Sequence, residues 1–457
     1  MTHPCEPKTT PGVPLSGTRA QTNEYLRKHQ LIPAQIAAPP SPRLGLVVVI
    51  PCFDEPALLP TLEALHACGR TTCDAEVIVV VNASQASPQA VHRRNRRTCE
   101  EARRWARRRS DRRLAFRVVY LPDLPPRHAG VGLARKLGMD EAVVRLHRAG
   151  APRGIIASLD ADCSCAPNYL QALERHFALN PRSPGCSIHF EHPLDGADAA
   201  HAGISRYELY LRYCVHGLRY GGLPYAHHTV GSAMAVRCDA YQREGGMNRR
   251  KAGEDFYFLH KLMRAGAFSE LRDTLVIPSA RASERVPFGT GRAVREWLRG
   301  GSDEYPVYAP EVFRDLGALC TAVGALQAGA EAAIVQRRLP EPLAAYLADS
   351  GFAAKVAEIR ANSASPDTFR KRFFGWLTAF RAFRYARRAS AGVYGWTPLA
   401  EAAGALLRWQ ALLGVGERPE APALLAHYRR MDREGRALPF DPVAAACAPR
   451  RGVEAAR

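Results

Sequence analysis

The chain has 457 residues, of which 47% are hydrophobic and 23% are charged. This length and balance exclude a disordered, collagen-like or coiled-coil chain. The sequence contains no run of about 18 consecutive apolar residues, so no membrane-spanning helix is predicted. The 63 Lys and Arg residues outnumber the 44 Asp and Glu residues, which gives a net charge of +19. Such a charge indicates either a GC-rich genome that favours arginine or an anionic partner, such as a nucleotide, a phosphorylated acceptor, a membrane surface or nucleic acid.

Residues 1–42 are rich in proline and poor in large apolar side chains, which predicts a disordered or loosely ordered tail with one short helix near residues 23–29. After this tail, short β-branched runs alternate with segments whose apolar residues have helical spacing. The alternation predicts an α/β domain with a mostly parallel sheet over residues 43–310, because continuous β-branched runs are typical of strands buried on both faces. The expected strands are residues 44–50, 76–81, 114–121 and 155–159, and the expected helices are residues 56–68, 88–109 and 131–147.

The composition changes near residue 311, where strand-like runs stop and Ala, Leu, Arg and Glu dominate. We therefore expect an α-helical accessory region over residues 311–457. The 12 cysteines are scattered without a CxxC pair, and the first residues lack the apolar segment of a signal peptide. These features predict a cytoplasmic protein, either soluble or in peripheral contact with an anionic membrane surface.

Polar and acidic side chains follow three of the expected strands. In a parallel sheet the carboxyl ends of the strands lie at one edge, where ligands bind. Two carboxylates one residue apart suit Mg²⁺ or Mn²⁺, which also take phosphate oxygens and water as ligands. A DxD segment also occurs in surface turns and helix caps, so its position directly after a β-branched strand is what favours a metal site. The residues at these strand ends are Pro51, Phe53, Glu55, Asn82, Asp160 and Asp162.

Several segments, in this order along the chain, resemble those of family-2 glycosyltransferases. The resemblance covers roughly residues 44–300, and the ordered set is more specific than any one segment. It implies a type-A Rossmann-like fold and the transfer of a sugar, expected to be a hexose, from a nucleotide-sugar donor to a hydroxyl acceptor. The segments are LVVVIPCFDE at 46–55, AGVGLARK at 129–136, SLDAD at 158–162, GSAMAV at 231–236 and GED at 253–255.

The resemblance also implies roles for individual residues. Asp160 and Asp162 would hold the divalent cation, Mg²⁺ or Mn²⁺, against the donor diphosphate, and Asp160 would thereby contact the donor. Asp255 would be the general base that deprotonates the acceptor hydroxyl, with Glu254 as the alternative, and a base implies an inverting displacement. The same acidic pair would otherwise cap the helix that follows it. The other donor-binding residues would be Pro51, Phe53, Glu55, Asn82, Arg135, Lys136, Arg285 and Arg292.

Some features leave alternatives open. Arg285 and Arg292 belong to a glycine-bearing loop at residues 283–292, which would close on the diphosphate or on an anionic acceptor. The family more often has an acidic residue at the position of Asn82, so the nucleotide base stays undetermined. Several histidines and tyrosines are expected to be structural or to line an acceptor pocket: His189, His192, His227, His228, Tyr207, Tyr210, Tyr213 and Tyr220.

The arginine-rich run at residues 92–109 is expected to be a solvated helix face, with an anionic membrane surface and nucleic acid as alternative partners. Three other functions stay open: a non-catalytic nucleotide-sugar-binding protein of the same fold, a sugar nucleotidyltransferase and a nucleic-acid binder. A nucleotidyltransferase should carry a glycine-rich loop after the first strand, whereas residues 51–60 contain no glycine. The acceptor is either a polyprenol-linked compound met at a membrane surface or a small soluble metabolite.

Overall fold

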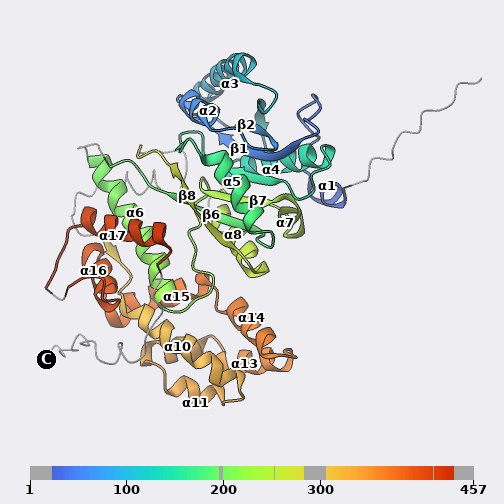
Figure 1. Ribbon diagram of the computed structural model, residues 1–457. Coiled ribbons are helices and arrows are strands. Elements are labelled where there is room, and N and C mark those ends of the chain that lie inside the picture. The colour runs from blue at the N-terminus through green and yellow to red at the C-terminus, as the bar shows by residue number, and fades with distance from the viewer. Residues whose placement is uncertain (1–22, 195–198, 252, 282–304, 415, 437–457) are drawn as a thin grey trace, which may run out of the picture.

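The computed structural model describes residues 23–194, 199–251, 253–281, 305–414 and 416–436. A sheet flanked by helices forms one end of the molecule, and helices from the second half of the chain form the other end (Figure 1). This arrangement confirms the predicted α/β class, with a mostly parallel sheet and a helical C-terminal region.

The large sheet has eight strands in the order β3-β2-β1-β4-β7-β6-β8-β5. The strands β3, β2, β1 and β4 run parallel, whereas β7 lies antiparallel between β4 and β6. The parallel part is built from the four strands that the sequence predicts, so their carboxyl ends meet at one edge. The strands are β1 (Leu44–Cys52), β2 (Asp74–Ser84), β3 (Leu114–Leu124), β4 (Ile155–Ser158), β5 (Ser164–Cys165), β6 (Gly185–Phe190), β7 (Met234–Arg237) and β8 (Ser269–Ile277).

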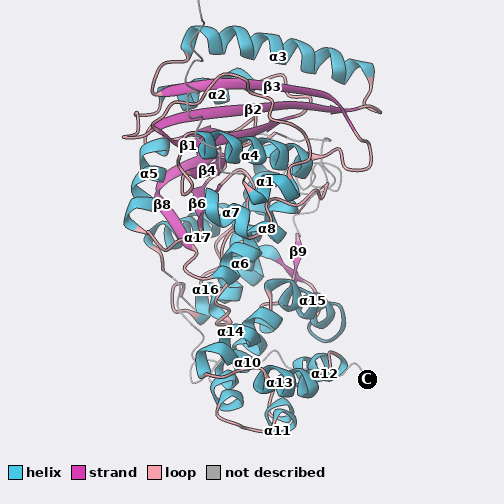
Figure 2. Cartoon of the chain, turned by 90° about the vertical axis from the view of Figure 1, so that its right-hand side faces the viewer, coloured by secondary structure: helices cyan, strands magenta, loops and turns pink. Residues whose placement is uncertain are grey.

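Helices cover both faces of this sheet, which explains why β1 is hydrophobic at almost every position. Leu46 and Val48 share a core with one helical layer, and Val47 and Val49 share a core with the other. Figure 2 shows α3 lying along the outer side of β2 and β3, opposite α4. The first layer is α2 (Leu58–Ala67), α3 (Gln89–Arg109) and α5 (Tyr169–Leu179), and the second is α1 (Glu24–His29), α4 (Val131–Arg148), α7 (Cys238–Arg243) and α8 (Glu254–Ala265).

The helical body has its own hydrophobic core, and α6 (Ala199–Tyr220) contributes to it. Since α6 precedes residue 310, the sheet and the helical body share this helix. The short strands β9 (Pro306–Val307) and β10 (Thr397–Pro398) pair antiparallel within this body. Among the described helices, none has the length and apolar character that crossing a membrane requires. The other helices are α10 (Glu311–Gln327), α11 (Ala332–Arg337), α12 (Glu341–Asp349), α13 (Phe352–Ala361), α14 (Pro366–Trp376), α15 (Ala379–Ala389), the π-helical turn η1 (Ser390–Tyr394), α16 (Leu399–Trp409) and α17 (Ala421–Glu434).

The N-terminal segment corrects the expectation of a loose tail, as far as it is described. The short helix predicted near residues 23–29 is present as α1, and Asn23 caps it. Tyr25 is buried and donates a hydrogen bond to Asp140 of α4 at 2.7 Å. The backbone N–H groups of Gln35 and Ile36 donate to Glu141 of the same helix. Residues 23–42 therefore pack on the sheet domain because α4 carries buried carboxylates that accept their hydrogen bonds; residues 1–22 lie outside the described residues.

Candidate active site

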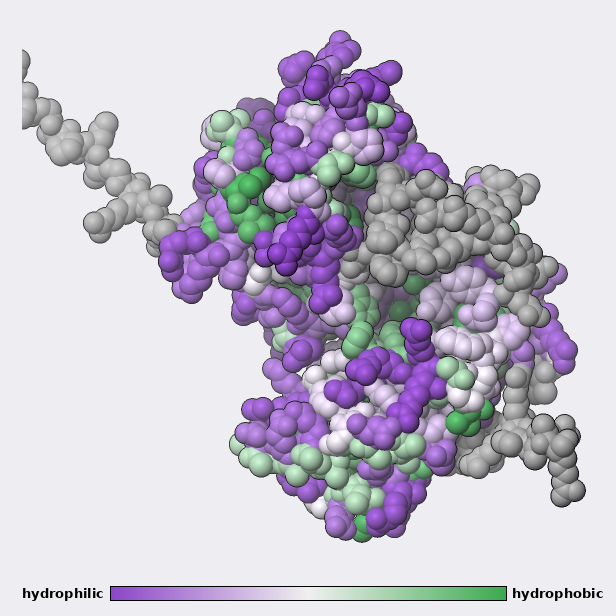
Figure 3. Space-filling model, turned by 180° about the vertical axis from the view of Figure 1, so that it is seen from behind, coloured by the Kyte–Doolittle hydropathy of each residue, from purple (hydrophilic) through white to green (hydrophobic). Residues whose placement is uncertain are grey.

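A cleft of about 1000 Å³ opens at the carboxyl ends of the parallel strands and continues to the helical body. Figure 3 shows this face of the molecule hollowed between its upper and lower parts. We call the part lined by the ends of β1, β2 and β4 and by the first turns of α4 and α8 the strand-end half. The aromatic half is lined by α6, by Phe190 and His192, by residues 225–230, by Phe256 and His260 of α8, and by Tyr308, Ala379 and Phe383 of the helical body.

The ends of β1 and β2 are held together by Asn95, a fully buried residue of α3. Its Oδ1 accepts a hydrogen bond from the backbone N–H of Asp54 at 2.9 Å, and its Nδ2 donates to the carbonyl of Asn82 at 2.8 Å. Asp54 has a φ of 52°, so the chain turns sharply after Phe53. This clamp places Pro51, Phe53 and Asn82, three of the expected donor-binding residues, on the cleft wall.

Asn82 has a buried side chain whose Oδ1 has no hydrogen-bond partner among the described residues. A buried unsatisfied oxygen typically costs about 1–3 kcal/mol. Because Asn82 lines the cleft, this oxygen can accept a hydrogen bond from a group that enters the cleft.

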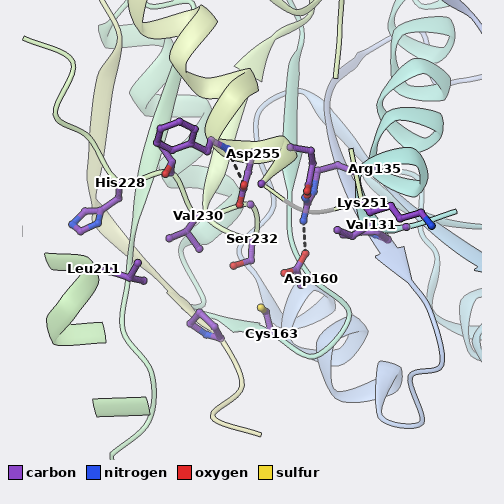
Figure 4. Close-up of a pocket in the computed structure, with 18 of the residues that line it drawn as sticks. Val131, Arg135, Asp160, Cys163, Leu211, His228, Val230, Ser232, Lys251 and Asp255 are labelled. Atoms are coloured by element: carbon purple, nitrogen blue, oxygen red, sulfur yellow. Dashed lines mark hydrogen bonds and ion pairs between the residues drawn. The ribbon is translucent and has the colours of Figure 1, made fainter. Parts of the chain in front are cut away.

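Arg135 is the centre of an ion-pair cluster under the strand-end half. Its guanidinium donates to Asp160 at 2.7 Å, to Ser158 at 2.9 Å and to Glu254, and its side chain is only 2% exposed. Figure 4 shows Arg135 and Asp160 facing each other across the cavity wall. A Cβ at Gly231 would lie 2.8 Å from the guanidinium, so glycine is required there for Arg135 to fit. Arg135 therefore joins the end of β4 to the start of α8 and is largely enclosed by its partners.

Asp255 lies at the start of α8, next to this cluster, and its Oδ1 accepts a hydrogen bond from the N–H of Phe256 at 2.8 Å. Burial is the main cause that raises the pKa of Asp255 above the ordinary 3.8, and the negative charge of Asp160 raises it further. The charge of Arg135 and the backbone N–H groups of Phe256 and Gly231 act in the opposite direction. A carboxylate whose pKa is moved towards neutral pH is suited to accept a proton. Figure 4 shows Asp255 and Asp160 on the wall of the same cavity.

Glu254, the alternative base, is in a different situation although it is the adjacent residue. Its side chain is 3% exposed and forms an ion pair with Arg135. Gly132 permits this contact between α4 and α8, because a Cβ there would lie 3.0 Å from the Cβ of Glu254 and would clash with the carbonyl of Arg250. Glu254 therefore serves to hold Arg135, and Asp255 is the better placed of the two carboxylates for proton transfer.

Asp160 and Asp162 both line the cleft, with side chains 39% and 27% exposed. Asp162 lies 3.4 Å from the guanidinium of Arg281, which sequence reasoning did not select. Within the described ranges, no group of three or more His, Cys, Asp or Glu residues gathers as a metal site. Two partly exposed carboxylates nonetheless fit Mg²⁺ or Mn²⁺, because these ions take further ligands from phosphate and water.

Two of the expected donor-binding residues do not reach the cleft. Lys136 is the neighbour of Arg135 on α4, but its ammonium group turns to Asp140 at 2.8 Å and to the hydroxyl of Tyr25 at 3.2 Å. Glu55 is fully buried, and its carboxylate accepts hydrogen bonds from Arg281 at 2.5 Å and from the N–H of Ala57 at 2.8 Å. Both therefore have structural contacts in place of ligand contacts. Arg285 and Arg292 lie outside the described residues.

The aromatic half includes some of the tyrosines noted in the sequence. Tyr207 and Tyr210 of α6 line it, whereas Tyr213 and Tyr220 are buried in the core of the helical body. Burial raises the pKa of Tyr207, and the neighbouring Tyr305 and Asp255 contribute to the rise. Tyr207 of the aromatic half is therefore close to Asp255 of the strand-end half.

The four histidines noted in the sequence contact buried or partly buried carboxylates that the sequence did not single out. His192 pairs with Glu208 at 2.9 Å, and His228 pairs with Asp432 at 2.9 Å. His227 pairs with Glu270 at 3.0 Å, and His189 pairs with Glu191 at 2.8 Å. Asp432 belongs to α17 and also accepts from Arg212, His216 and Arg219 of α6, so this network fastens the C-terminal helix beside the cleft. Separations of more than 200 residues left no signal for it in the sequence.

The arginine-rich run forms α3, a single helix of 21 residues whose buried face packs on the sheet. Its arginines are exposed, and the described pairs include Arg94 with Asp54 and Arg97 with Glu101, each at 2.8 Å. This matches the prediction of a solvated helix face. Whether a membrane or a nucleic acid contacts this face stays a prediction.

The comparisons with known proteins give little beyond a distant likeness. The chain matches no protein-family profile and no curated protein. It is similar to a solved structure of residues 1–349 of S. aureus TarS, with 13% identity, a TM-score of 0.36, and coverage of 71% of this chain and 89% of that chain. The same segment of TarS in complex with UDP-GlcNAc has 14% identity and a TM-score of 0.38 over the same shares. At these values the likeness carries no argument, and a function has to be argued from the cleft itself.

Proposed function

We propose that this protein is a glycosyltransferase that moves a sugar, expected to be a hexose, from a nucleotide-sugar donor to a hydroxyl acceptor. The observation that carries the proposal is the meeting of two kinds of carboxylate in one cleft. The Asp160 and Asp162 pair follows the parallel strand β4, and Asp255 lies in the first turn of α8, which Arg135 joins to the end of β4. The pair Asp160 and Asp162 suits a charged diphosphate with its cation, and Asp255 suits proton transfer.

The strand-end half would bind the nucleotide. Phe53 offers an apolar face at the end of β1, and the unpaired Oδ1 of Asn82 at the end of β2 would accept a hydrogen bond from an N–H group on the edge of the base. Uracil, guanine and adenine all carry such a group, so a panel of UDP-, GDP- and ADP-sugars is needed to identify the base. Arg281 would add positive charge beside the diphosphate, since its guanidinium lies near Asp162.

Asp160 and Asp162 would hold the divalent cation against the donor diphosphate. When bound, Mg²⁺ or Mn²⁺ would neutralise the charge of the departing nucleoside diphosphate. Arg135 would keep Asp160 in place through the hydrogen bond of 2.7 Å, because its other contacts fix it to β4 and α8. The contribution of the chain is therefore to orient both carboxylates on the floor of the cleft before the donor arrives.

Asp255 would accept the proton of the acceptor hydroxyl. The acceptor oxygen would then bond to the anomeric carbon of the sugar while the bond from that carbon to the diphosphate oxygen breaks. The nucleoside diphosphate would leave with the electron pair, and the displacement would invert the anomeric configuration. Burial prepares Asp255 for this step, since it raises the pKa of the carboxyl group above its ordinary value.

Thermal shift measurements with UDP-glucose, UDP-GlcNAc, GDP-mannose and ADP-glucose, with and without Mn²⁺, test this proposal. We expect one donor to raise the melting temperature in the presence of Mn²⁺, and Asp162→Asn to remove that rise. Asp273→Asn is the matched control, because its side chain is 66% exposed on β8 outside the cleft lining. Absence of any shift would refute the proposal. A shift without release of nucleoside diphosphate in the presence of hydroxyl acceptors would favour a non-catalytic nucleotide-sugar-binding protein.

A further inference from the structure

The aromatic half of the cleft lacks the charges that mark the strand-end half. The charged residues that line the cleft in the described ranges lie at or after strand ends, at the starts of α4 and α8, or in the loop before α8. They are Arg135, Asp160, Asp162, Lys251, Glu254, Asp255 and Arg281. Beyond Asp255, the lining consists of aromatic, aliphatic and histidine side chains together with Cys214 and Thr229. Burial lowers the pKa of His260 to about 4, with the charge of Arg264 as the next cause, so this imidazole is neutral at pH 7. A ligand with a phosphate or carboxylate group would find no lysine or arginine among the described lining residues of this half.

Some buried hydrogen-bonding atoms in the aromatic half have no partner among the described residues. They are Nε2 of His192 and both ring nitrogens of His260. His192 has a side chain only 2% exposed, and its Nδ1 and its backbone N–H both bond to Glu208, which fixes the orientation of the ring. His260 packs against Phe256 with ring centroids 4.2 Å apart. Leaving such atoms unpaired is costly, so a ligand with several polar groups is indicated.

Aromatic rings continue from this part of the cleft to the surface of the helical body. The charge of Asp255 contributes to the raised pKa of Tyr207. The ring centroids of Tyr207 and Tyr210 are 6.5 Å apart. Further along, Tyr308 stacks on Phe383 at 5.9 Å and lies 5.6 Å from Trp396. Trp396 is 48% exposed, which is unusual for so large an apolar side chain. Tyr308 also interacts with Tyr210. The rings therefore lead from Tyr207 to Trp396, which lies at the surface just outside the residues that line the cleft.

We infer that the aromatic half binds an uncharged saccharide chain as the acceptor. The ring that carries the reacting hydroxyl would lie against Tyr207 and Tyr210 beside Asp255, and preceding rings would lie over Tyr308 and Trp396. This inference rests on the proposed function, because it names the substrate class of the same site.

Three properties of the half favour a saccharide over other acceptors. The apolar faces of sugar rings pack on aromatic side chains, and their hydroxyl groups would pair with His192 and His260. A polyprenol chain would fill the aromatic path but would leave those nitrogens unpaired. A phosphorylated or carboxylated acceptor would lack a cationic partner in the described lining.

Binding of fluorescent, uncharged oligosaccharides to the full-length protein tests the inference without a donor. We would use an array of gluco-, manno-, galacto- and N-acetylglucosamine-based oligosaccharides, together with sialylated and phosphorylated sugars and vesicles that contain polyprenyl phosphate. We expect at least one uncharged oligosaccharide to bind, and Trp396→Ala to weaken its affinity about fivefold. Trp396 is exposed, so this variant should fold; Leu179→Ala, at a position 73% exposed on α5, is the control that should bind as the wild type does.

Preference for phosphorylated sugars, sialylated sugars or vesicles would overturn the inference, and so would saccharide binding that Trp396→Ala leaves unchanged. A nucleotide-sugar shift without any uncharged saccharide bound would overturn the inference while the proposed function stands. Saccharide binding that Trp396→Ala weakens, in a protein that no nucleotide sugar stabilises, would support the saccharide site and refute the proposed function.

Discussion

The two halves of the cleft differ in how they satisfy their polar groups. In the strand-end half, the carboxylates and guanidinium groups satisfy one another, as Arg135 does with Asp160 and Glu254, although Oδ1 of Asn82 has no partner among the described residues. In the aromatic half, the rings of His192 and His260 keep nitrogen atoms for which the described chain offers no partner. This contrast supports the proposal that the first half binds a charged diphosphate and that the second half binds the hydroxyl groups of an uncharged ligand. Asp255 lies where the two halves meet.

The two halves also come from different parts of the chain. The strand-end half is built from β1, β2 and β4, whose local sequence determines that they are buried strands. The aromatic half depends on α6 and on the helical body, which the buried carboxylate of Asp432 connects through Arg212, His216 and Arg219. The first half is therefore set by strand order, and the second by ion pairs between distant helices.

The largest effect is expected for Asp255→Asn, which removes the proposed base at the junction of the halves. An amide cannot accept the acceptor proton, so turnover should fall about 10²–10⁴-fold while donor affinity stays unchanged. Nucleoside diphosphate release gives the turnover, and calorimetry gives the donor affinity. Asp273→Asn should retain full turnover; an Asp255→Asn variant that did so as well would exclude Asp255 as the base.

Arg135→Gln should affect both stability and the pH profile. Removing a buried partner leaves Glu254 and Asp160 unpaired, which typically costs about 3–5 kcal/mol. Because the charge of Arg135 lowers the pKa of Asp255, the variant should lose activity at a higher pH than the wild type as the pH falls.

Arg145→Gln is the matched control for Arg135→Gln. Arg145 is also fully buried on α4, but it pairs with Glu76, away from the cleft lining. We expect denaturant unfolding to show a comparable loss of stability and the acidic limb of kcat/KM to stay in place. A shift of this limb in both variants would show that it reports general destabilisation.

Lys136→Met tests whether Lys136 binds the donor, as the sequence suggested, or only stabilises the fold. The change should lower the free energy of unfolding by about 1–3 kcal/mol, because Asp140 keeps hydrogen bonds from Tyr25 and Tyr241. Donor affinity, measured by calorimetry on the folded variant, should not change. A loss of donor affinity of tenfold or so would place Lys136 in the strand-end half after all.

The smallest effect is expected for His260→Phe, which keeps the aromatic contact and removes the unpaired nitrogens. The acceptor KM should rise about 3–10-fold without a change in donor affinity. Folding lowers the pKa of His260 from 6.5 to about 4, so the unfolded chain takes up a proton first as the pH falls. This group therefore costs the wild type stability between about pH 6.5 and 4, and the variant should lose less stability over that range in denaturant titrations. Equal losses in both proteins would contradict the assignment.

Much of the fold could be predicted because β1 and β2 carry continuous apolar runs that fit only a sheet covered on both faces. The parallel strands and the helices α3 and α4 lie within a few residues of the predicted positions. The strand β7 was not predicted, because Met234–Arg237 has only four residues, too few to show an alternating hydrophobic pattern. Its antiparallel position between β4 and β6 also depends on partners far along the chain.

For the site, Asp160, Asp162 and Asn82 could be predicted to line one edge of the sheet, because they follow buried parallel strands whose carboxyl ends lie at the same edge. The sequence assigns both Arg135 and Lys136 to the donor site. Adjacent residues of a helix point in different directions, and only packing shows which one faces the cleft. Asn95, Arg281 and Asp432 were not selected, because each acts through a partner far along the chain.

Hydrogen exchange on the full-length protein, measured separately with a nucleotide sugar and with an uncharged oligosaccharide, tests most directly that the two halves bind two different substrates. With UDP-glucose, GDP-mannose or ADP-glucose, whichever gives the largest thermal shift, we expect slower exchange at residues 51–55, 82–84 and 160–163. With the oligosaccharide that binds most tightly on the array, we expect slower exchange at residues 207–215, 305–308 and 379–383. Protection of the same segments by both ligands, or protection by the nucleotide sugar only in the aromatic half, would contradict the division of the cleft into a donor half and an acceptor half.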